Sequence, residues 1–469
     1  MGDEIAVRRE GEVAIIEINN PPVNALSNAV RAGLLQALQA AAEEDDVEAI
    51  VIAGAGRTFC AGAEIREFGT PPLAPLLPDL IGAIEAVEKP VVAAIRGVAF
   101  GGGFEIALGT HARVAAPDAR FALPEVKLGL IPGAGGTQRL PRLIGLVRSV
   151  RLILSGDPVD AAEAKTLGII DAIVEGDLLA GAIAHATAMA AAKQPLRRLS
   201  REEGALAADR ADPAAFETEA AALLKRARGL DAPTGCLEAL RNTLTLPFTE
   251  GLKREREIFV RLRDGEQSKA QRHLFFAERA ALKVCGIGKE LKPRAVKRVA
   301  VLGAGTMGGG IAMCFASAGI PVTIVDPNPE ALQRGLGIVE GNYRASAKRG
   351  SMTNEAVEAA LALIAGSSDF ASVAAADLVI EAVFEDMALK KRIFADLDRL
   401  TKPGTVLATN TSSLDINEIA TATNRPGDVL GMHFFSPANV MKLLEVVRAE
   451  KTATDALLTA IDVGTKIGK

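Results

Sequence analysis

The chain has 469 residues, of which 49% are hydrophobic and 24% charged, a balance typical of soluble globular proteins with room for two to four domains. Its net charge of −5, with one Tyr and no Trp, argues against a nucleic-acid partner, which needs a basic surface and aromatic stacking platforms. No apolar run reaches the length that crosses a bilayer, so we expect no membrane partner.

The cysteines and the N-terminal segment indicate the kind of cell compartment. The charged N-terminal stretch MGDEIAVRREGE has no signal-peptide core. No Cys/His cluster is present, so we expect no metal site. The cysteines have no paired spacing and are read as reduced thiols in a reducing compartment: Cys60, Cys236, Cys285 and Cys314.

The N-terminal part alternates short strands and helices. Strands are predicted at 13–18 and 48–53, with a helix between them that Ser27 caps. A Pro-rich stretch, residues 70–78, precedes a helix at 81–87 and is read either as a segment stiffened by its prolines or as a surface loop. This alternation predicts an α/β layer structure.

A glycine turn follows the predicted strand at 91–95. Gly101 to Gly103 lead into a helix, and such a turn points backbone N–H groups at a ligand with no side chain in the way. Glu105 lies in the first turn of that helix, and Glu125 follows the next predicted strand. Two carboxyls in one pocket can divide the work of acid and base, although a helix dipole alone also favours Glu105, and Glu125 could be a loop charge.

Four sequence motifs favour a catalytic role for these two glutamates. NNPPVNALS, FCAGAEIREF, GVAFGGGFEIALG and FALPEVKLGLIPGAGGTQRL occur in this order. Together they resemble the enoyl-CoA hydratase (crotonase) family over roughly residues 5–190. The resemblance implies that Glu105 and Glu125 are the catalytic glutamates and that the N–H groups of Ala63 and Gly102 form the oxyanion hole for a thioester carbonyl. Glu64 stands where the family often has Asp, a change that keeps the charge.

Residues 178–290 read as largely helical and richly charged. A long amphipathic helix with a break near Asp264-Gly265 is predicted toward the end of this region. Acidic residues interleave with Lys and Arg there, which favours a solvated face over a membrane or nucleic-acid surface: Glu250, Glu255, Glu257, Glu266 and Glu278. Residues 286–293 (GIGKELKP) are interpreted as a linker.

A second site begins after this linker. A strand at 297–302 is followed by a glycine fingerprint and a helix, and the next strand ends at Asp326. This context is typical of a Rossmann dinucleotide fold, and the Asp326 carboxylate would accept hydrogen bonds from the ribose and repel a phosphate, which favours NAD over NADP. The predicted cofactor-binding residues here are Gly303, Gly305, Thr306, Met307, Gly308 and Asp326.

Further motifs extend this assignment to the end of the chain. IEAVFEDMALK, ATNTSSL and GMHFFSPANVMKLLEVV resemble, with GAGTMGGGIA, the 3-hydroxyacyl-CoA dehydrogenase family. The resemblance implies His433 as general base, Glu445 as its charge partner and Ser412 as a ligand of the substrate oxygen. It also implies that three residues surround the nicotinamide half of the cofactor: Glu385, Lys390 and Asn410.

Two features depart from the dehydrogenase pattern. Ser436 stands where many relatives carry Asn. The family continues into a helical domain that supplies a substrate-contacting Asn, whereas this chain stops at Lys469. We therefore expect a truncated chain whose dehydrogenase half binds NAD yet turns over poorly.

Together these patterns predict an α/β protein with three parts. Residues 1–190 form a crotonase (ββα spiral) fold, residues 191–290 a helical extension, and residues 291–469 a Rossmann-type NAD-binding domain. Both halves together resemble the bifunctional enzymes of fatty-acid β-oxidation (multifunctional enzyme type 1).

The resemblance implies hydration of a trans-2-enoyl-CoA, a coenzyme A thioester, and NAD-dependent oxidation of the product, with enoyl-CoA isomerase as an added activity. Two alternatives stay open: another enolate chemistry of the crotonase fold beside an inactive dehydrogenase half, and a non-catalytic subunit that binds acyl-CoA and NAD. We expect a monomer, with an oligomer as alternative, in a bacterial cytoplasm, with a peroxisome as alternative.

Overall fold

The computed structural model describes residues 4–225, 227–284 and 290–469. The chain divides into two compact units between Ala280 and Ala281. Cys285 and the first part of the predicted linker, residues 286–289, lie outside the described residues.

The first unit contains a mixed sheet and a smaller sheet. The mixed sheet has the order β1-β2-β3-β4-β6-β9, and its neighbours are parallel except β1 and β2. The smaller sheet has the order β5-β7-β8. The strands are β1 (Ile5–Glu10), β2 (Val13–Ile18), β3 (Ala49–Gly54), β4 (Val91–Ile95), β5 (Val98–Phe100), β6 (Ala112–Ala115), β7 (Arg120–Ala122), β8 (Val159–Asp160) and β9 (Ala172–Ile173).

The smaller sheet sets the position of the two glutamates. Strands β5 and β7 are parallel, and Phe100 pairs with Ala122. Because parallel strands end at the same edge, the chain leaves both strands side by side and carries Glu105 and Glu125 to that edge.

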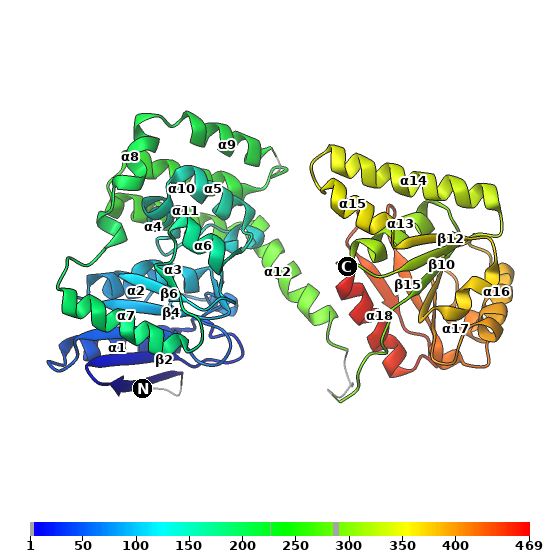
Figure 1. The fold of residues 1–469 in the computed structure, drawn as a ribbon, viewed down its shortest axis with the longest axis horizontal. Coiled ribbons are helices and arrows are strands. Elements are labelled where there is room, and N and C mark those ends of the chain that lie inside the picture. The colour runs from blue at the N-terminus through cyan, green and yellow to red at the C-terminus, as the bar shows by residue number, and fades with distance from the viewer. Residues whose placement is uncertain (1–3, 226, 285–289) are drawn as a thin grey trace. The chain divides into compact units, whose positions relative to one another are not determined.

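Helices cover the sheet of the first unit and continue its core. Helix α7 packs along β3 and β4, and α4, α5, α10 and α11 form a cluster (Figure 1). Ser27 caps α1 as predicted, through its side chain and the Val30 amide. The helices are α1 (Asn28–Glu43), η1 (Ile65–Glu67), α2 (Leu77–Ala86), α3 (Gly102–Gly109), η2 (Pro124–Leu128), α4 (Gly136–Ile144), α5 (Leu146–Ser155), α6 (Ala161–Leu167), α7 (Leu178–Ala192), η3 (Leu199–Arg201), α8 (Gly204–Ala211), α9 (Ala214–Leu224), α10 (Asp231–Thr245), α11 (Phe248–Asp264) and α12 (Glu266–Ala281).

The helices after residue 190 share the hydrophobic core of the sheet. Phe216, Leu237 and Ile258 are buried in the same cluster as Ile52 and Phe104. Burial of this apolar surface fixes the later helices against the part of the chain that carries the glutamates.

The second unit is a doubly wound sheet with helices on both faces. Its order is β12-β11-β10-β13-β14-β15-β16, with parallel neighbours except β15 and β16. Separate apolar clusters lie on its two faces. The elements are β10 (Val299–Leu302), α13 (Thr306–Ser317), β11 (Val322–Val325), α14 (Pro329–Lys348), α15 (Asn354–Leu361), β12 (Ile364–Ser367), η4 (Phe370–Ala375), β13 (Leu378–Glu381), α16 (Met387–Leu400), β14 (Val406–Thr409), α17 (Ile416–Ala420), η5 (Pro426–Asp428), β15 (Val429–Phe434), β16 (Leu444–Val447) and α18 (Thr454–Lys466).

The α/β class predicted from the sequence is confirmed in both units. Cys60, Cys236 and Cys314 are buried free thiols. Within the described ranges, no helix is both long and apolar enough to cross a bilayer.

Candidate functional site

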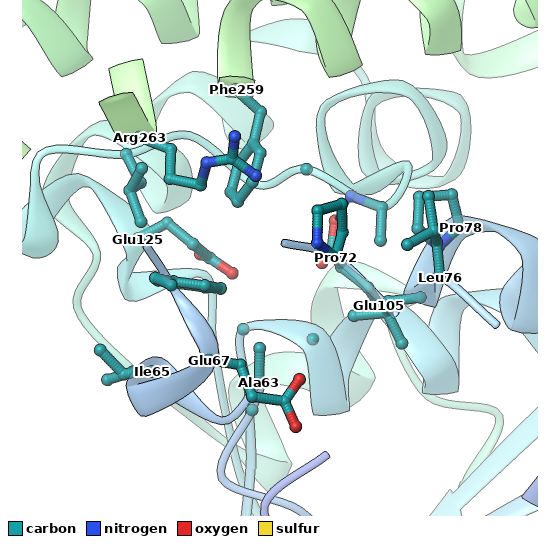
Figure 2. A pocket seen from close by; sticks show the side chains of 18 of the residues that line it. Ala63, Ile65, Glu67, Pro72, Leu76, Pro78, Glu105, Glu125, Phe259 and Arg263 are labelled. Carbon is teal, nitrogen blue, oxygen red and sulfur yellow. Dashed lines mark hydrogen bonds between the residues drawn. The ribbon is translucent and has the colours of Figure 1, made fainter. Parts of the chain in front are cut away.

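A pocket of about 220 Å³ lies in the first unit, where segments far apart in the sequence meet. Figure 2 shows Ala63, Glu105, Glu125, Phe259 and Arg263 among the side chains around it. Apolar and proline side chains form much of the rest of its wall, which suits an acyl group better than a polar ligand.

The glycine turn has a backbone conformation and close contacts that only glycine permits. Gly101 has φ 51° and ψ −126°, and a Cβ there would lie 2.8 Å from the Glu125 Oε1 atom. Gly102 begins α3, so its N–H has no partner inside the helix. A Cβ on Gly102 would lie 3.4 Å from the Ala63 nitrogen. The two groups predicted to form the oxyanion hole are therefore neighbours in the pocket wall.

Glu105 is held by backbone amides. Only 3% of its surface is exposed, and its Oε1 atom accepts hydrogen bonds of 2.8 Å each from the N–H groups of Ala134 and Gly136. Burial raises the pKa of Glu105, while these two amides oppose the rise because they stabilise the ionised form.

Glu125 lies in the short helix η2 and has a different environment. Its Oε2 atom is buried, and no residue in the described part of the chain gives it a hydrogen bond. Burial raises the pKa of Glu125 well above its ordinary value, and the negative charges of Glu105 and Glu255 add to the shift. The pocket thus contains one amide-bound carboxylate and one carboxyl that favours its protonated form.

The position of Glu255 contradicts the prediction made from the sequence. The prediction that it lies on a solvated face is wrong: the side chain is fully buried and accepts hydrogen bonds from the Gly135 and Thr137 amides at 2.6 and 2.9 Å. Burial raises its pKa to about 8, with the charge of Glu105 as the next cause. The missed signal is the helical spacing of Glu255 from other buried residues of α11: Gly251 at i−4, Phe259 at i+4 and Leu262 at i+7.

The Pro-rich stretch forms one wall of the pocket. Arg31 of α1 donates to the Pro75 carbonyl at 2.9 Å, and Asn28 donates to the Leu73 and Ala74 carbonyls at 3.1 and 2.9 Å. Arg31 also forms an ion pair with Glu67. These contacts tie the stretch to α1 and η1, in line with the stiff interpretation.

The second unit places the glycine fingerprint between β10 and α13. Gly303 has φ 98°, Gly305 has no atom within 4 Å of an added Cβ, and a Cβ on Gly308 would lie 1.8 Å from the Gly303 carbonyl oxygen. Thr306 and Met307 form the first turn of α13. Asp326 follows β11, and its Oδ2 atom accepts a hydrogen bond of 2.9 Å from the Ala304 amide. This turn leaves room for a pyrophosphate beside the Asp326 carboxylate, whose contact with the ribose stays a prediction.

His433 and Glu445 pair across antiparallel strands. They face each other in the register of β15 and β16, and the Nδ1 and Oε2 atoms are 2.8 Å apart. The carboxylate fixes the orientation of the imidazole, and the role of His433 as general base stays a prediction.

The remaining predicted residues lie near the carboxyl ends of β13, β14 and β15. Asn410 accepts a hydrogen bond of 2.7 Å from the Phe434 amide, next to His433. Glu385 accepts one of 3.1 Å from the Ser412 amide. Lys390 is fully buried, with its ammonium 2.8 Å from Glu381 and 3.3 Å from Glu385. The geometry makes Glu381 the principal partner of Lys390, and direct contact of Lys390 with the cofactor stays a prediction.

Comparison with known proteins identifies both units. The family described as Enoyl-CoA hydratase/isomerase matches residues 8–235, and the family described as 3-hydroxyacyl-CoA dehydrogenase, NAD binding domain, matches residues 298–469. The chain is 46% identical to a peroxisomal bifunctional enzyme of Danio rerio, over 97% of this chain and 63% of that protein. It is 42% identical to a peroxisomal bifunctional enzyme of Cavia porcellus, over 99% of this chain and 64% of that protein. It is also 40% identical to a peroxisomal fatty acid beta-oxidation multifunctional protein of Oryza sativa subsp. japonica, over 97% of this chain and 64% of that protein.

The chain therefore joins a crotonase-type domain to the NAD-binding Rossmann domain of a 3-hydroxyacyl-CoA dehydrogenase. Each unit matches one of these two families, and the relatives named above are called bifunctional or multifunctional enzymes. The chain spans 63–64% of the length of the three relatives named above.

Proposed function

We propose that the first unit hydrates trans-2-enoyl-CoA thioesters and that the second oxidises the resulting 3-hydroxyacyl-CoA with NAD, as steps of fatty-acid β-oxidation. The observation that carries the hydratase part is the unlike pair of buried carboxyls in one pocket, beside the amides of Ala63 and Gly102. Paired groups whose pKa values are pushed apart are suited to serve as acid and base.

The hydration step follows from these environments. The thioester oxygen accepts hydrogen bonds from the Ala63 and Gly102 amides, which stabilise the enolate as it develops. Glu105 takes a proton from a water molecule, whose oxygen bonds to C3 of the substrate. Glu125 donates its proton to C2, and the two carboxyls regain their starting forms when the proton on Glu105 returns to Glu125 through solvent.

The oxidation step uses the second unit. His433 accepts the proton of the substrate hydroxyl, and Glu445 stabilises the imidazolium that results. Ser412 is proposed to bind the substrate oxygen. The glycine turn and Asp326 fit NAD, which accepts the hydride from C3 when bound.

Isomerase activity is a second candidate for the same pocket. The specific observation is again the pair of carboxyls, because moving a double bond between the 3- and 2-positions needs one proton removed and one delivered through the same thioester enolate. A 3-enoyl-CoA offered without NAD tests it by the appearance of the conjugated thioester.

A coupled assay tests the main proposal. Purified protein receives a trans-2-enoyl-CoA and NAD, and hydration is followed as loss of the ultraviolet absorbance of the conjugated thioester while oxidation is followed as NADH. Hydration that proceeds without NAD, and NADH formation that depends on hydration, support the proposal. Absence of hydration with intact binding of the acyl-CoA would favour a binding subunit.

The proposal also covers the substrates, the oligomeric state and the cell compartment. We propose acyl-CoA thioesters as substrates and a monomer in solution, which light scattering after size-exclusion chromatography tests. The relatives are named for the peroxisome, so a peroxisomal location is now favoured over the bacterial cytoplasm expected from the sequence. Microscopy of the tagged protein in its own cell tests this choice.

A further inference from the structure

Four consecutive amides, two in the loop before α4 and two in its first turn, donate alternately to two buried glutamates. We call residues 134–137 the amide loop. Its first and third N–H groups donate to Glu105 Oε1 at 2.8 Å each. Its second and fourth donate to Glu255 at 2.6 and 2.9 Å. The two side chains therefore bind alternating N–H groups of the same short segment.

The amide loop adopts a conformation that glycine alone supplies. Gly135 has φ +104°, and an added Cβ would lie 2.1 Å from the Arg139 Nη1 atom. A Cβ on Gly136 would lie 2.9 Å from Glu105 Oε1. Because glycine leaves the backbone free to adopt other conformations, the hydrogen bonds to side chains are what select this one.

Helix α11 delivers Glu255 from a distant part of the chain. Gly251, one turn earlier, lets α11 approach α4, since a Cβ there would lie 2.2 Å from the Gln138 Oε1 atom. Phe259, one turn later, packs where a Cβ on Gly133 would lie 2.4 Å from its ring. The Thr137 hydroxyl adds a hydrogen bond of 2.5 Å to Glu255 Oε2. The contact is thus built from three successive turns of α11.

We propose that Glu255 is a positioning residue of the hydratase site: by holding the second and fourth amides of the amide loop, it aims the first and third at Glu105. Glu255 does not line the pocket, whereas Glu105 does. This inference rests on the proposed hydration activity and adds to it a residue outside the motif-bearing segments.

The charges around Glu255 give the proposal a pH signature. It faces Glu105 of α3 and Glu125 of η2, with Arg256 beside it on α11 and Arg139 of α4 close to Glu105. Its negative charge raises the pKa of Glu125. Glu255 carries this charge above its pKa of about 8, so in that range its removal lowers the pKa of Glu125 and the acid loses its proton at lower pH.

The test compares Glu255→Gln with Glu257→Gln. Glu257 lies on the same helix, is exposed and pairs only with Arg254 among the described residues. We expect Glu255→Gln to lower the kcat of enoyl-CoA hydration by about 10- to 100-fold with KM changed little, because a small misplacement of a catalytic group has an effect of this size. The alkaline limb of its pH–rate profile should move to lower pH, and Glu257→Gln should match the wild type.

Amide hydrogen exchange supplies a readout that needs no activity. In Glu255→Gln, exchange of the peptide that contains the amide loop should accelerate, while peptides from the sheet should keep the wild-type rate. Unchanged kcat, pH profile and exchange in Glu255→Gln would overturn the inference. So would an equal loss of kcat and of substrate binding with general unfolding, which would indicate a purely structural role. A wild type that does not hydrate enoyl-CoA would instead overturn the proposed function, and exchange would still decide whether Glu255 orders the loop.

Discussion

Glu105 and Glu125 differ in their hydrogen-bonding environments. Glu105 receives two amide hydrogen bonds, which favour its ionised form, whereas Glu125 has a buried oxygen without a partner in the described chain. At the scale of single residues, this difference in hydrogen bonding supports the proposed roles of Glu105 as base and Glu125 as acid.

Glu125→Gln tests the role of the acid. The amide keeps the shape of the side chain but has no acidic proton to give to C2, so we expect kcat for hydration to fall by about 10²- to 10⁴-fold. NAD affinity, measured by titration, should stay at the wild-type value. Hydration at the wild-type rate would remove Glu125 from the mechanism.

His433→Ala separates the two activities. Without the imidazole, no side chain accepts the hydroxyl proton, and NADH formation from a 3-hydroxyacyl-CoA should fall by about 10²- to 10⁴-fold. Hydration should be unaffected, because His433 belongs to the other compact unit. His185→Ala is a control on helix α7, away from the predicted sites, and should change neither rate.

At the scale of elements, the strand–turn–helix unit of the second domain uses its glycines for different purposes. Gly303 supplies a left-handed backbone, Gly305 leaves open space, and Gly308 permits contact between α13 and the turn. One fingerprint therefore combines a requirement for ligand access with a requirement for packing.

Alanine substitutions distinguish these two requirements. Gly308→Ala forces a Cβ against the Gly303 carbonyl and should lower the free energy of unfolding of the second unit by about 1–3 kcal/mol. Gly305→Ala meets no atom within 4 Å and should leave that free energy nearly unchanged while weakening NAD binding. Chemical denaturation and NAD titration measure both effects, and equal stability losses in the two variants would contradict this division.

At the scale of the whole molecule, a cluster of buried carboxyls links stability to pH. The pKa values of Glu105, Glu125 and Glu255 are all raised, chiefly by burial. The folded chain therefore retains protons that the unfolded chain releases above the ordinary glutamate pKa of 4.5. Stability from these groups is fully present below that value and is lost as pH rises through the folded pKa, which is about 8 for Glu255.

We expect the free energy of unfolding of the first unit to decrease from about pH 5 to about pH 8.5. Glu255→Gln removes one of the titrating groups and should show a shallower decrease over the same window. Urea denaturation across that range measures both slopes, and identical slopes would show that Glu255 titrates alike in the folded and unfolded chain.

Local patterns in the sequence determined much of this protein. The glycine turns, the strands and helices around them, the Ser27 cap and the spacing of His433 and Glu445 could all be predicted, because each depends on neighbouring residues or on a recognisable motif. The α/β class followed from the alternation of these elements.

Only the tertiary structure decided how the buried glutamates are used. The contact between Thr137 and Glu255 joins residues 118 positions apart, and the helical spacing of Glu255 does not show which segment covers it. Likewise, the amides that hold Glu105 lie at the beginning of α4, 29 to 31 residues away. Burial and hydrogen bonding set the pKa values of these carboxyls, and both depend on which segments pack together rather than on the residues next to them in the chain.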